Sequence, residues 1–181
     1  MKTLKKSKFI LVMLVVVAIT AMTSCTSDDD AGGDPAAAVA GAGQIVATID
    51  GSVYQSLAAG TTANITNNNG TEFLQITSVN LGGEAVTITV IRPTIETAAY
   101  DFDSNLNITA TITYTRIDAG TFESDSFVAP FMDSGDVGTI TITELTSNNI
   151  RGTFNAMMSN QDTNQIIDVT GGSFDIPVTR M

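Results

Sequence analysis

The sequence predicts an all-β fold, either an antiparallel β-sandwich or a closed barrel of about nine or ten strands. From residue 44 onward, short runs rich in β-branched residues are separated by turn residues at intervals of roughly 8–12 positions, which is typical of these architectures. Most runs alternate apolar and polar residues with a period of two, as strands with one buried face do. No stretch of a dozen residues repeats apolar residues at helical spacing, so little helix is expected.

The first two strands are predicted on either side of Asp50-Gly51, at 45–49 and 53–57. Asp-Gly is a strong hairpin signal, because a type I′ turn requires positive φ at both central residues. In the run 85–91, valine and isoleucine alternate with threonine. The same kind of alternation predicts four later strands, at 108–116, 139–143, 150–158 and 174–178.

Other turn residues mark where strands end. Pro93 cannot donate a ladder hydrogen bond and is therefore expected to end the strand before it. Glycine and asparagine tolerate the positive φ of tight turns. Pairs of these residues predict four more turns, at Asn69-Gly70, Gly82-Gly83, Asn148-Asn149 and Gly171-Gly172.

Residues 1–24 are predicted to be a lipoprotein signal peptide. Residues 1–8 hold every lysine of the chain, and 9–21 form an apolar run too short to span a membrane. The run ends at Met22-Thr23-Ser24-Cys25, which resembles the processing site of bacterial lipoproteins. The resemblance implies cleavage after Ser24 and acylation of Cys25, the sole cysteine in the sequence. An ordinary thiol beyond a plain secretory cleavage site is the alternative.

Residues 25–43 are predicted to be a lipidated N-terminus followed by a flexible linker. Ser27, Asp28, Asp29 and Asp30 come just after the cysteine and resemble the surface-export signal of Bacteroidota lipoproteins. A solvated tether is the alternative interpretation of these acids. The alanine- and glycine-rich stretch that follows has no periodicity, as in linkers. A single all-β domain is then expected over 44–181.

The predicted mature chain is strongly acidic. It retains four arginines against 19 aspartates and glutamates, a formal charge of −15. This charge repels phosphate backbones, so no nucleic-acid partner is expected. The sequence has no histidine, and cleavage would remove every lysine. These absences exclude imidazole bases, Ser-His-Asp triads, Schiff-base chemistry and conventional zinc sites. We therefore expect no cofactor and no enzymatic activity.

One catalytic class, carboxylate chemistry, remains compatible with this composition. A glycosidase needs two carboxyl groups about 5–9 Å apart, and the candidates are Glu72, Glu84, Glu96, Glu123 and Glu144. Nothing in the sequence selects a pair, and most of these acids flank turns, where solvation explains them. A small carbohydrate-active hydrolase is thus an alternative to a binding domain.

A possible cation site lies at Asp101, Asp103 and Asn105, which place oxygen ligands at alternate positions. Calcium prefers six to eight oxygen ligands, and calcium loops use this spacing. The glycine and the distal glutamate of an EF-hand are missing, and Asp and Asn also cap turns on their own account. A plain turn is the main interpretation, and a calcium-stabilised adhesion module is the alternative.

The segment 127–132, Phe-Val-Ala-Pro-Phe-Met, is the most apolar stretch that lacks clean alternation. Exposed apolar patches often mark contact sites. Phe127 and Phe131 are therefore the predicted binding residues, for a cell-surface protein or glycan. The alternative is that the segment continues a buried strand or closes one end of the fold.

Threonine ladders at 87–89, 109–115 and 139–143 could form a flat hydroxyl array of the kind that binds ice. Their starts are 22 and 30 residues apart, so no constant repeat supports such an array. Threonine on the wet face of a sheet is the ordinary expectation. The chain has no tryptophan, and its three tyrosines, at 54, 100 and 114, are expected in the core or at an interface rather than as a sugar platform.

Six short segments of the domain carry a resemblance to a known group of proteins. They are Ala47-Thr48-Ile49-Asp50-Gly51, Val53-Tyr54, Ala99-Tyr100-Asp101-Phe102, Gly138-Thr139-Ile140-Thr141-Ile142, Arg151-Gly152-Thr153-Phe154 and Gly171-Gly172-Ser173-Phe174. Through them the domain as a whole resembles small surface lipoproteins of Bacteroidota whose all-β domain has no known function. The resemblance covers roughly 45–178 and implies the fold and an outer-membrane location, lipid-anchored and facing the cell exterior, with the acyl chains in the membrane. It implies no activity, so a binding or envelope-structural role is expected.

Overall fold

The computed structural model describes residues 39–105, 109–117, 120–121 and 123–181. These residues form eleven strands and one 3₁₀ turn, η1, at Ala58–Gly60. The all-β prediction is confirmed. The strand number exceeds the predicted nine or ten, because segments without clean apolar alternation, such as β8, also pair into the sheet. The strands are β1 (Gln44–Ile49), β2 (Ser52–Gln55), β3 (Thr62–Asn68), β4 (Thr71–Val79), β5 (Ala85–Arg92), β6 (Ala99–Asp103), β7 (Ala110–Ile117), β8 (Ser124–Ala129), β9 (Asp136–Leu145), β10 (Asn149–Ser159) and β11 (Ile166–Arg180).

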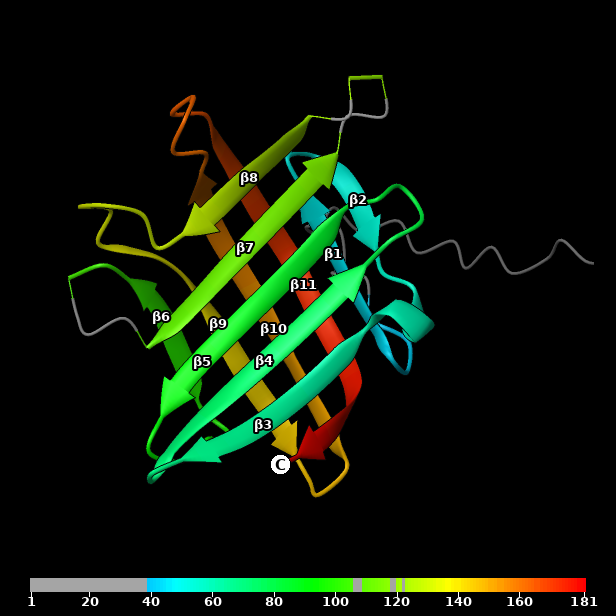
Figure 1. Cartoon of the computed structure of the whole chain (residues 1–181), viewed down its shortest axis with the longest axis vertical. Helices are drawn as coiled ribbons and strands as arrows, with labels where there is room; N and C mark the ends of the chain where they lie inside the picture. Colours follow the sequence, from blue (N-terminus) through cyan, green and yellow to red (C-terminus); the bar gives the residue numbers. More distant parts are fainter. Residues whose placement is uncertain (1–38, 106–108, 118–119, 122) are drawn as a thin grey trace, which may run out of the picture. The chain divides into compact units, whose positions relative to one another are not determined.

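All the strands belong to one hydrogen-bonded sheet, in the order β2-β1-β11-β3-β4-β5-β7-β8-β10-β9-β6. An additional pairing of β10 with β11 closes the seven strands from β11 to β10 into a ring. In Figure 1, β3, β4, β5, β7 and β8 lie in front of β9, β10 and β11 and cross them. The side chains that point into the space between these two layers form the core.

One pair of strands departs from the predicted antiparallel pattern. β11 and β3 run parallel, with Val178 opposite Ala63 and Arg180 opposite Ile65. Parallel strands cannot be joined by a hairpin, and these two are separated by most of the domain sequence. The ring therefore closes through a contact between distant parts of the chain, which a local sequence pattern does not reveal.

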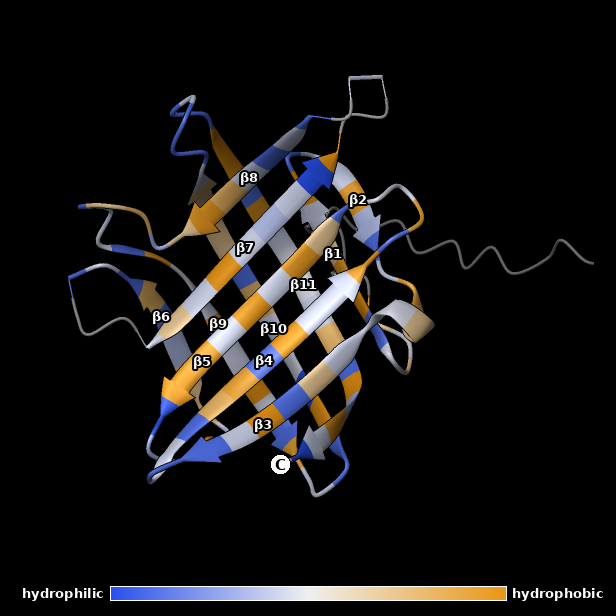
Figure 2. Cartoon of the chain, in the orientation of Figure 1, coloured by the Kyte–Doolittle hydropathy of each residue, from blue (hydrophilic) through white to orange (hydrophobic). Residues whose placement is uncertain are grey.

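The predicted alternation decides which side chains face the core. Val86, Ile88 and Val90 on β5 are fully buried, whereas the threonines between them are partly exposed. Figure 2 shows the same alternation as apolar and polar bands along the strands. The three tyrosines, Tyr54, Tyr100 and Tyr114, are also buried, as expected for core rings.

Two of the predicted tight turns have the backbone conformation that their residues favour. Asp50 and Gly51 have φ of 49° and 77°, and Asn69 and Gly70 have φ of 53° and 83°. These positive values at both central residues match the type I′ hairpin geometry. They join β1 to β2 and β3 to β4.

The predicted turn at Gly171-Gly172 is wrong, because both residues lie inside β11. The pairing with β10 shifts by one residue here, since Gly172 is opposite Phe154 while Val169 is opposite Ala156. Gly171 has φ of 59°, and the extra residue forms a β-bulge, which favours glycine as a tight turn does. A Cβ on Gly172 would lie 2.7 Å from the Phe154 ring, so the second glycine is required by close packing.

Candidate functional site

Three charged residues occupy inward positions at the ends of strands in the front layer, which consists of β3, β4, β5, β7 and β8. Glu84 lies directly before β5, Arg116 near the end of β7, and Asp125 near the start of β8. Each lies two residues from a buried side chain, Val86, Tyr114 or Phe127, and so keeps the inward phase. Since β5, β7 and β8 are neighbours, all three side chains line one pocket at this end of the ring.

Arg116 and Asp125 form an ion pair across two adjacent strands. They are directly opposite in the β7–β8 register, and both Nη2 and Nε of Arg116 lie 3.1 Å from Oδ2 of Asp125. The guanidinium also lies 5.1 Å from the centre of the buried Phe127 ring, within the range of a cation–π contact. The two side chains are 36% and 49% exposed, so the pair adds little stability. Its effect is to fix the position of the guanidinium.

The carboxylate of Glu84 is held by two neighbouring side chains. The hydroxyl of Tyr114 donates a hydrogen bond to Oε1 at 2.6 Å, and the side-chain amide of Asn80 donates one to Oε2. The backbone N–H of Glu84 in turn donates to Oδ1 of Asn80 at 2.9 Å. The tight turn at 80–84 therefore orients this carboxylate before any ligand arrives.

Two tyrosines close enough to Glu84 to feel its charge remain protonated far above neutral pH. Burial raises the pKa of Tyr114, and the hydrogen bond and negative charge of Glu84 raise it further. Burial is also the main reason that the pKa of Tyr54 is raised. The Tyr54 hydroxyl lies 2.8 Å from Oγ of Ser78. Both phenols are therefore neutral hydrogen-bonding groups at physiological pH, and Tyr114 is the donor to Glu84.

The pocket has a volume of about 420 Å³, within the range of small-molecule sites. Two carboxylates and one guanidinium give it a net negative charge, and carboxylates accept hydrogen bonds from hydroxyl or ammonium groups. Ile117, which is 48% exposed, adds an apolar side. Its complete lining is Gly82, Glu84, Arg116, Ile117 and Asp125.

The segment 127–132 does not form the exposed apolar tip that the sequence suggested. Phe127 is completely buried, because β8 pairs with β7 and turns this ring into the core opposite Tyr114. The two rings are 6.1 Å apart. Phe131 is half-buried, and its backbone N–H donates to Oγ of Ser134 at 3.3 Å. Met132, at 88% exposure, is the one strongly exposed apolar side chain of the segment.

The residues of the suggested calcium loop take part in local hydrogen bonds. Oδ1 of Asp101 accepts a hydrogen bond from the Thr139 hydroxyl at 3.0 Å, and Oδ1 of Asp103 accepts one from the backbone N–H of Asn105 at 2.7 Å. The second bond is the pattern by which Asp caps a turn. Among the residues described, no three acidic side chains are grouped so that they could hold a metal ion.

The glutamates proposed for hydrolysis are dispersed. Glu72 lies near the end of the ring away from the pocket, where Oε2 accepts the backbone N–H of Ile95 at 2.6 Å and Oε1 lies 3.7 Å from Nη1 of Arg180. Glu144 pairs with Arg151 at 3.3 Å. Glu84 is the one of the five that lines the pocket, and its carboxylate neighbour there is Asp125. The suggested lipidation residue Cys25 and export residues Ser27, Asp28, Asp29 and Asp30 lie outside the described residues.

Arg116 and Asp125 are not among the site residues predicted from the sequence, although the sequence does contain a signal for them. Arg116 continues the inward series of Ile112 and Tyr114, and Asp125 precedes Phe127 in the inward series of β8. A charged residue in the apolar phase of a strand is costly to bury. It therefore marks either the open end of a fold or a functional pocket.

The comparisons with known proteins bear on the family of this domain. Across the described part of the chain, no helix is both long and apolar enough to cross a membrane. Neither the curated proteins nor the solved structures include a match to this chain. A family model does match residues 42–177, which is most of the chain. The chain belongs to this family, DUF6252, which is described as a domain of unknown function.

Proposed function

We propose that the chain is a lipid-anchored surface protein whose β domain binds a small polar ligand without transforming it. The ligand would occupy the pocket of Glu84, Arg116 and Asp125. The observation that carries this proposal is the prior orientation of the charged groups. Tyr114 and Asn80 hold the carboxylate of Glu84, while Asp125 and Phe127 hold the guanidinium of Arg116. Groups that are already ordered cost a ligand less free energy to engage.

The chemistry of the pocket favours a ligand rich in hydroxyl or ammonium groups. Its carboxylates accept hydrogen bonds, and their excess over the single arginine disfavours an anion. The isoleucine at the rim can contact the carbon skeleton of the ligand. An amino sugar or a small amino alcohol combines these features.

Thermal melting of the full chain in detergent tests this assignment. Glucosamine, glucose, ethanolamine and putrescine would each be added at millimolar concentration. A ligand at 100 times its Kd should stabilise the folded state by about 2.7 kcal/mol. Glu84→Gln should abolish the stabilisation, whereas Glu144→Gln, the same substitution outside the pocket, should retain it. A Glu84→Gln variant that responds as fully as the wild type would exclude the pocket as the binding site.

The anchor is proposed from the sequence. Each buried CH₂ of an acyl chain contributes about 0.8 kcal/mol, and one chain alone binds only marginally, so stable anchoring requires more than one. Mass spectrometry of the mature N-terminus should find a multiply acylated Cys25. An unmodified thiol at that position, or release of the protein into the medium, would contradict the proposal.

Exposure on the cell exterior is proposed from the acids at 28–30. Replacing all three with alanine should leave the protein membrane-bound but protect it from protease added to intact cells. The wild-type protein should be degraded under the same conditions. Equal degradation of the two proteins would show that these acids serve only as a solvated tether.

A second candidate function, glycoside hydrolysis, is favoured by one observation, since Glu84 and Asp125 line the same pocket. Against it, Asp125 is engaged by Arg116 and Glu84 by Tyr114. A screen of aryl glycosides decides between the two functions. Turnover that Glu84→Gln and Asp125→Asn both abolish would establish hydrolysis and overturn the non-enzymatic proposal.

A further inference from the structure

The outer surface of the front layer has no ionisable side chain on its strands. The outward residues of β3, β4, β5, β7 and β8 are threonine, serine, asparagine, glutamine, alanine, valine, isoleucine and one phenylalanine. Strand register aligns most of them in four rows that run across the strands. The rows are Thr66-Phe73-Ile91, Asn64-Gln75-Thr89-Thr111, Thr62-Thr77-Thr87-Thr113-Val128 and Val79-Ala85-Thr115-Ser126. We call this surface the neutral face.

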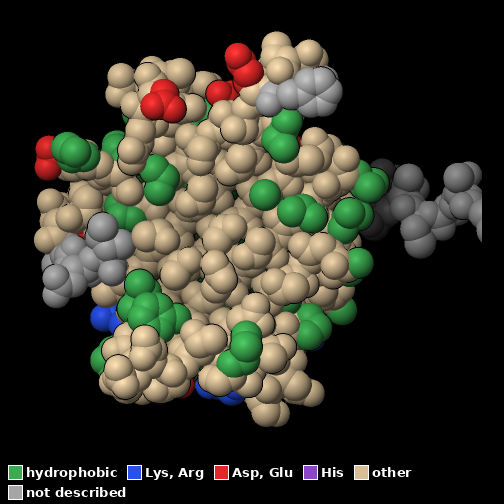
Figure 3. Space-filling model, viewed as in Figure 1, with side chains coloured by type: hydrophobic (Ala, Val, Ile, Leu, Met, Phe, Trp, Pro, Cys, Tyr) green, Lys and Arg blue, Asp and Glu red, His purple; other side chains and the backbone are tan. Residues whose placement is uncertain are grey.

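The neutral face is unusual for a chain with this charge. A soluble domain is ordinarily designed with about 25–35% charged residues on its surface, and this sequence carries 19 acidic residues. Figure 3 views the face directly, and its charged side chains lie at the margins. The charged residues of the front-layer strands occupy the two ends of the ring, with Arg116 and Asp125 at one end and Glu72 and Arg92 at the other. The need for a soluble surface does not by itself explain why the outward positions of these strands carry no charged side chain.

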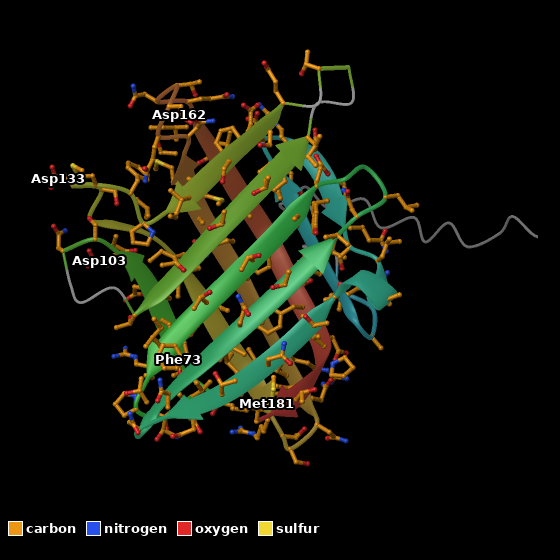
Figure 4. The ribbon with its side chains drawn as sticks, in the orientation of Figure 1. Phe73, Asp103, Asp133, Asp162 and Met181 are labelled. Carbon is orange, nitrogen blue, oxygen red and sulfur yellow. The ribbon has the colours of Figure 1, made fainter. Side chains whose placement is uncertain are left out.

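One corner of the neutral face has an aromatic ring. Phe73 points outward from β4, and its cross-strand neighbour on β5 is Ile91, which is 37% exposed. Figure 4 labels Phe73 at the lower end of the front layer. Phe73 is partly exposed, and an aromatic ring beside an aliphatic side chain offers an apolar platform next to rows of hydroxyl groups. This combination matches a pyranose, which has an apolar C–H face and a rim of hydroxyls.

We propose that the neutral face binds a short stretch of an extended, uncharged polysaccharide. Adjacent strands are about 4.7–4.9 Å apart, close to the length of one sugar unit in an extended β-linked glycan. A row therefore offers one hydroxyl or amide group for each sugar, and threonine and glutamine can both donate and accept hydrogen bonds. The sugars would lie over Asn64, Gln75, Thr89 and Thr111, and the Phe73 ring of the adjoining row would contact the sugar over Gln75.

The charge distribution favours this occupant over others. An anionic glycan would be repelled by the acidic chain, and so would a second copy, which carries the same negative charge. A rigid planar surface such as ice requires a flat array, whereas neighbouring strands in a sheet rotate by about 20–25°. A flexible neutral chain of three or four sugars can follow that twist. The proposal does not depend on what occupies the pocket of Glu84.

Affinity electrophoresis of the full chain in detergent provides the test. The gels would contain hydroxyethylcellulose, glucomannan or polygalacturonate, and reference gels would contain no polysaccharide. We expect at least one of the two neutral glycans to retard the wild-type protein, whereas polygalacturonate should not. Phe73→Leu, which keeps an apolar side chain but removes the ring, and Thr89→Lys should each weaken the retardation at least tenfold. Thr153→Lys, on the exposed outer side of β10, is the matched control and should behave as the wild type.

Several results would overturn the proposal. These are no retardation by either neutral glycan, equal retardation by polygalacturonate, or an equal effect of Thr89→Lys and Thr153→Lys when thermal melts show that both variants fold. Sedimentation that finds a dimer dissociated by Thr89→Lys would make the neutral face a self-association surface instead. Inhibition of ice recrystallisation without glycan binding would assign it to ice.

Discussion

Replacing Gly152 with alanine should destabilise the domain strongly, because no space exists for a single methyl group. Gly152 lies on β10 between Ile142 of β9 and Phe174 of β11. An added Cβ would lie 2.1 Å from the carbonyl oxygen of Thr141 and 2.4 Å from Cζ of Phe174. The first contact is with backbone, so relief requires β9 to move. The second is with a buried ring, which packs 6.5 Å from Phe154 and cannot leave without opening a cavity.

The cost can be bounded from these contacts. Overpacking a core costs about 1–3 kcal/mol, and displacing a buried phenylalanine costs about 3–5 kcal/mol. We expect Gly152→Ala to lower the free energy of unfolding by about 3–5 kcal/mol and the melting temperature by about 10–20 °C. Gly82→Ala is the matched control, because its added Cβ would meet only the Asn80 side chain, at 3.3 Å. Calorimetry in which both variants melt within about 2 °C of the wild type would refute the packing argument.

Four further outcomes follow from the structure. Phe127→Ala should cost about 3–5 kcal/mol in a urea titration, because the ring is fully buried, whereas the exposed Met132→Ala should cost little. Stability should fall as pH rises above about 10, since the raised pKa values of Tyr114 and Tyr54 keep protons in the folded state that the unfolded chain releases. Tyr114→Phe should melt with a weaker dependence on alkaline pH. Hydrogen bonding to Arg151 lowers the pKa of Asp175, so stability present at neutral pH should decline below about pH 4, and Asp175→Asn should reduce that decline. The melting temperature should be unchanged by EDTA, and a rise with added calcium would favour the adhesion alternative.

The parts of the fold that follow from local rules could be predicted from the sequence. The alternation in 85–91 and the Asp50-Gly51 turn depend on sterics and burial within a few residues, and both were predicted correctly. Gly171-Gly172 was misassigned because a turn and a β-bulge require the same backbone freedom. The two differ in what lies opposite, here Phe154 on β10. The closure of the ring by β11 and β3 was not predictable from local patterns, because it joins segments that are far apart in the sequence.

The pocket could be predicted only in part from the alternation of apolar and polar residues along the chain. Glu84, Arg116 and Asp125 each break the apolar phase of a strand, so the sequence marks each as unusual. It does not state that their strands are neighbours. β5 and β7 pair directly even though β6 lies between them in the chain. This pairing places Glu84 and Arg116 at the same pocket. A search for charges in the apolar phase would have found the three residues without assembling them.

The threonines of the neutral face are likewise aligned by strand pairing rather than by their spacing in the sequence. The threonine ladders start at unequal intervals in the sequence, but antiparallel pairing does not require a constant repeat. Thr87 pairs with Thr113 and Thr89 with Thr111 because the register of β5 and β7 fixes them, whatever the length of the chain between these strands. The ladder at 139–143 lies on β9 instead, in the other layer. A two-dimensional array can therefore arise from an irregular sequence, and the absence of a repeat is not evidence against one.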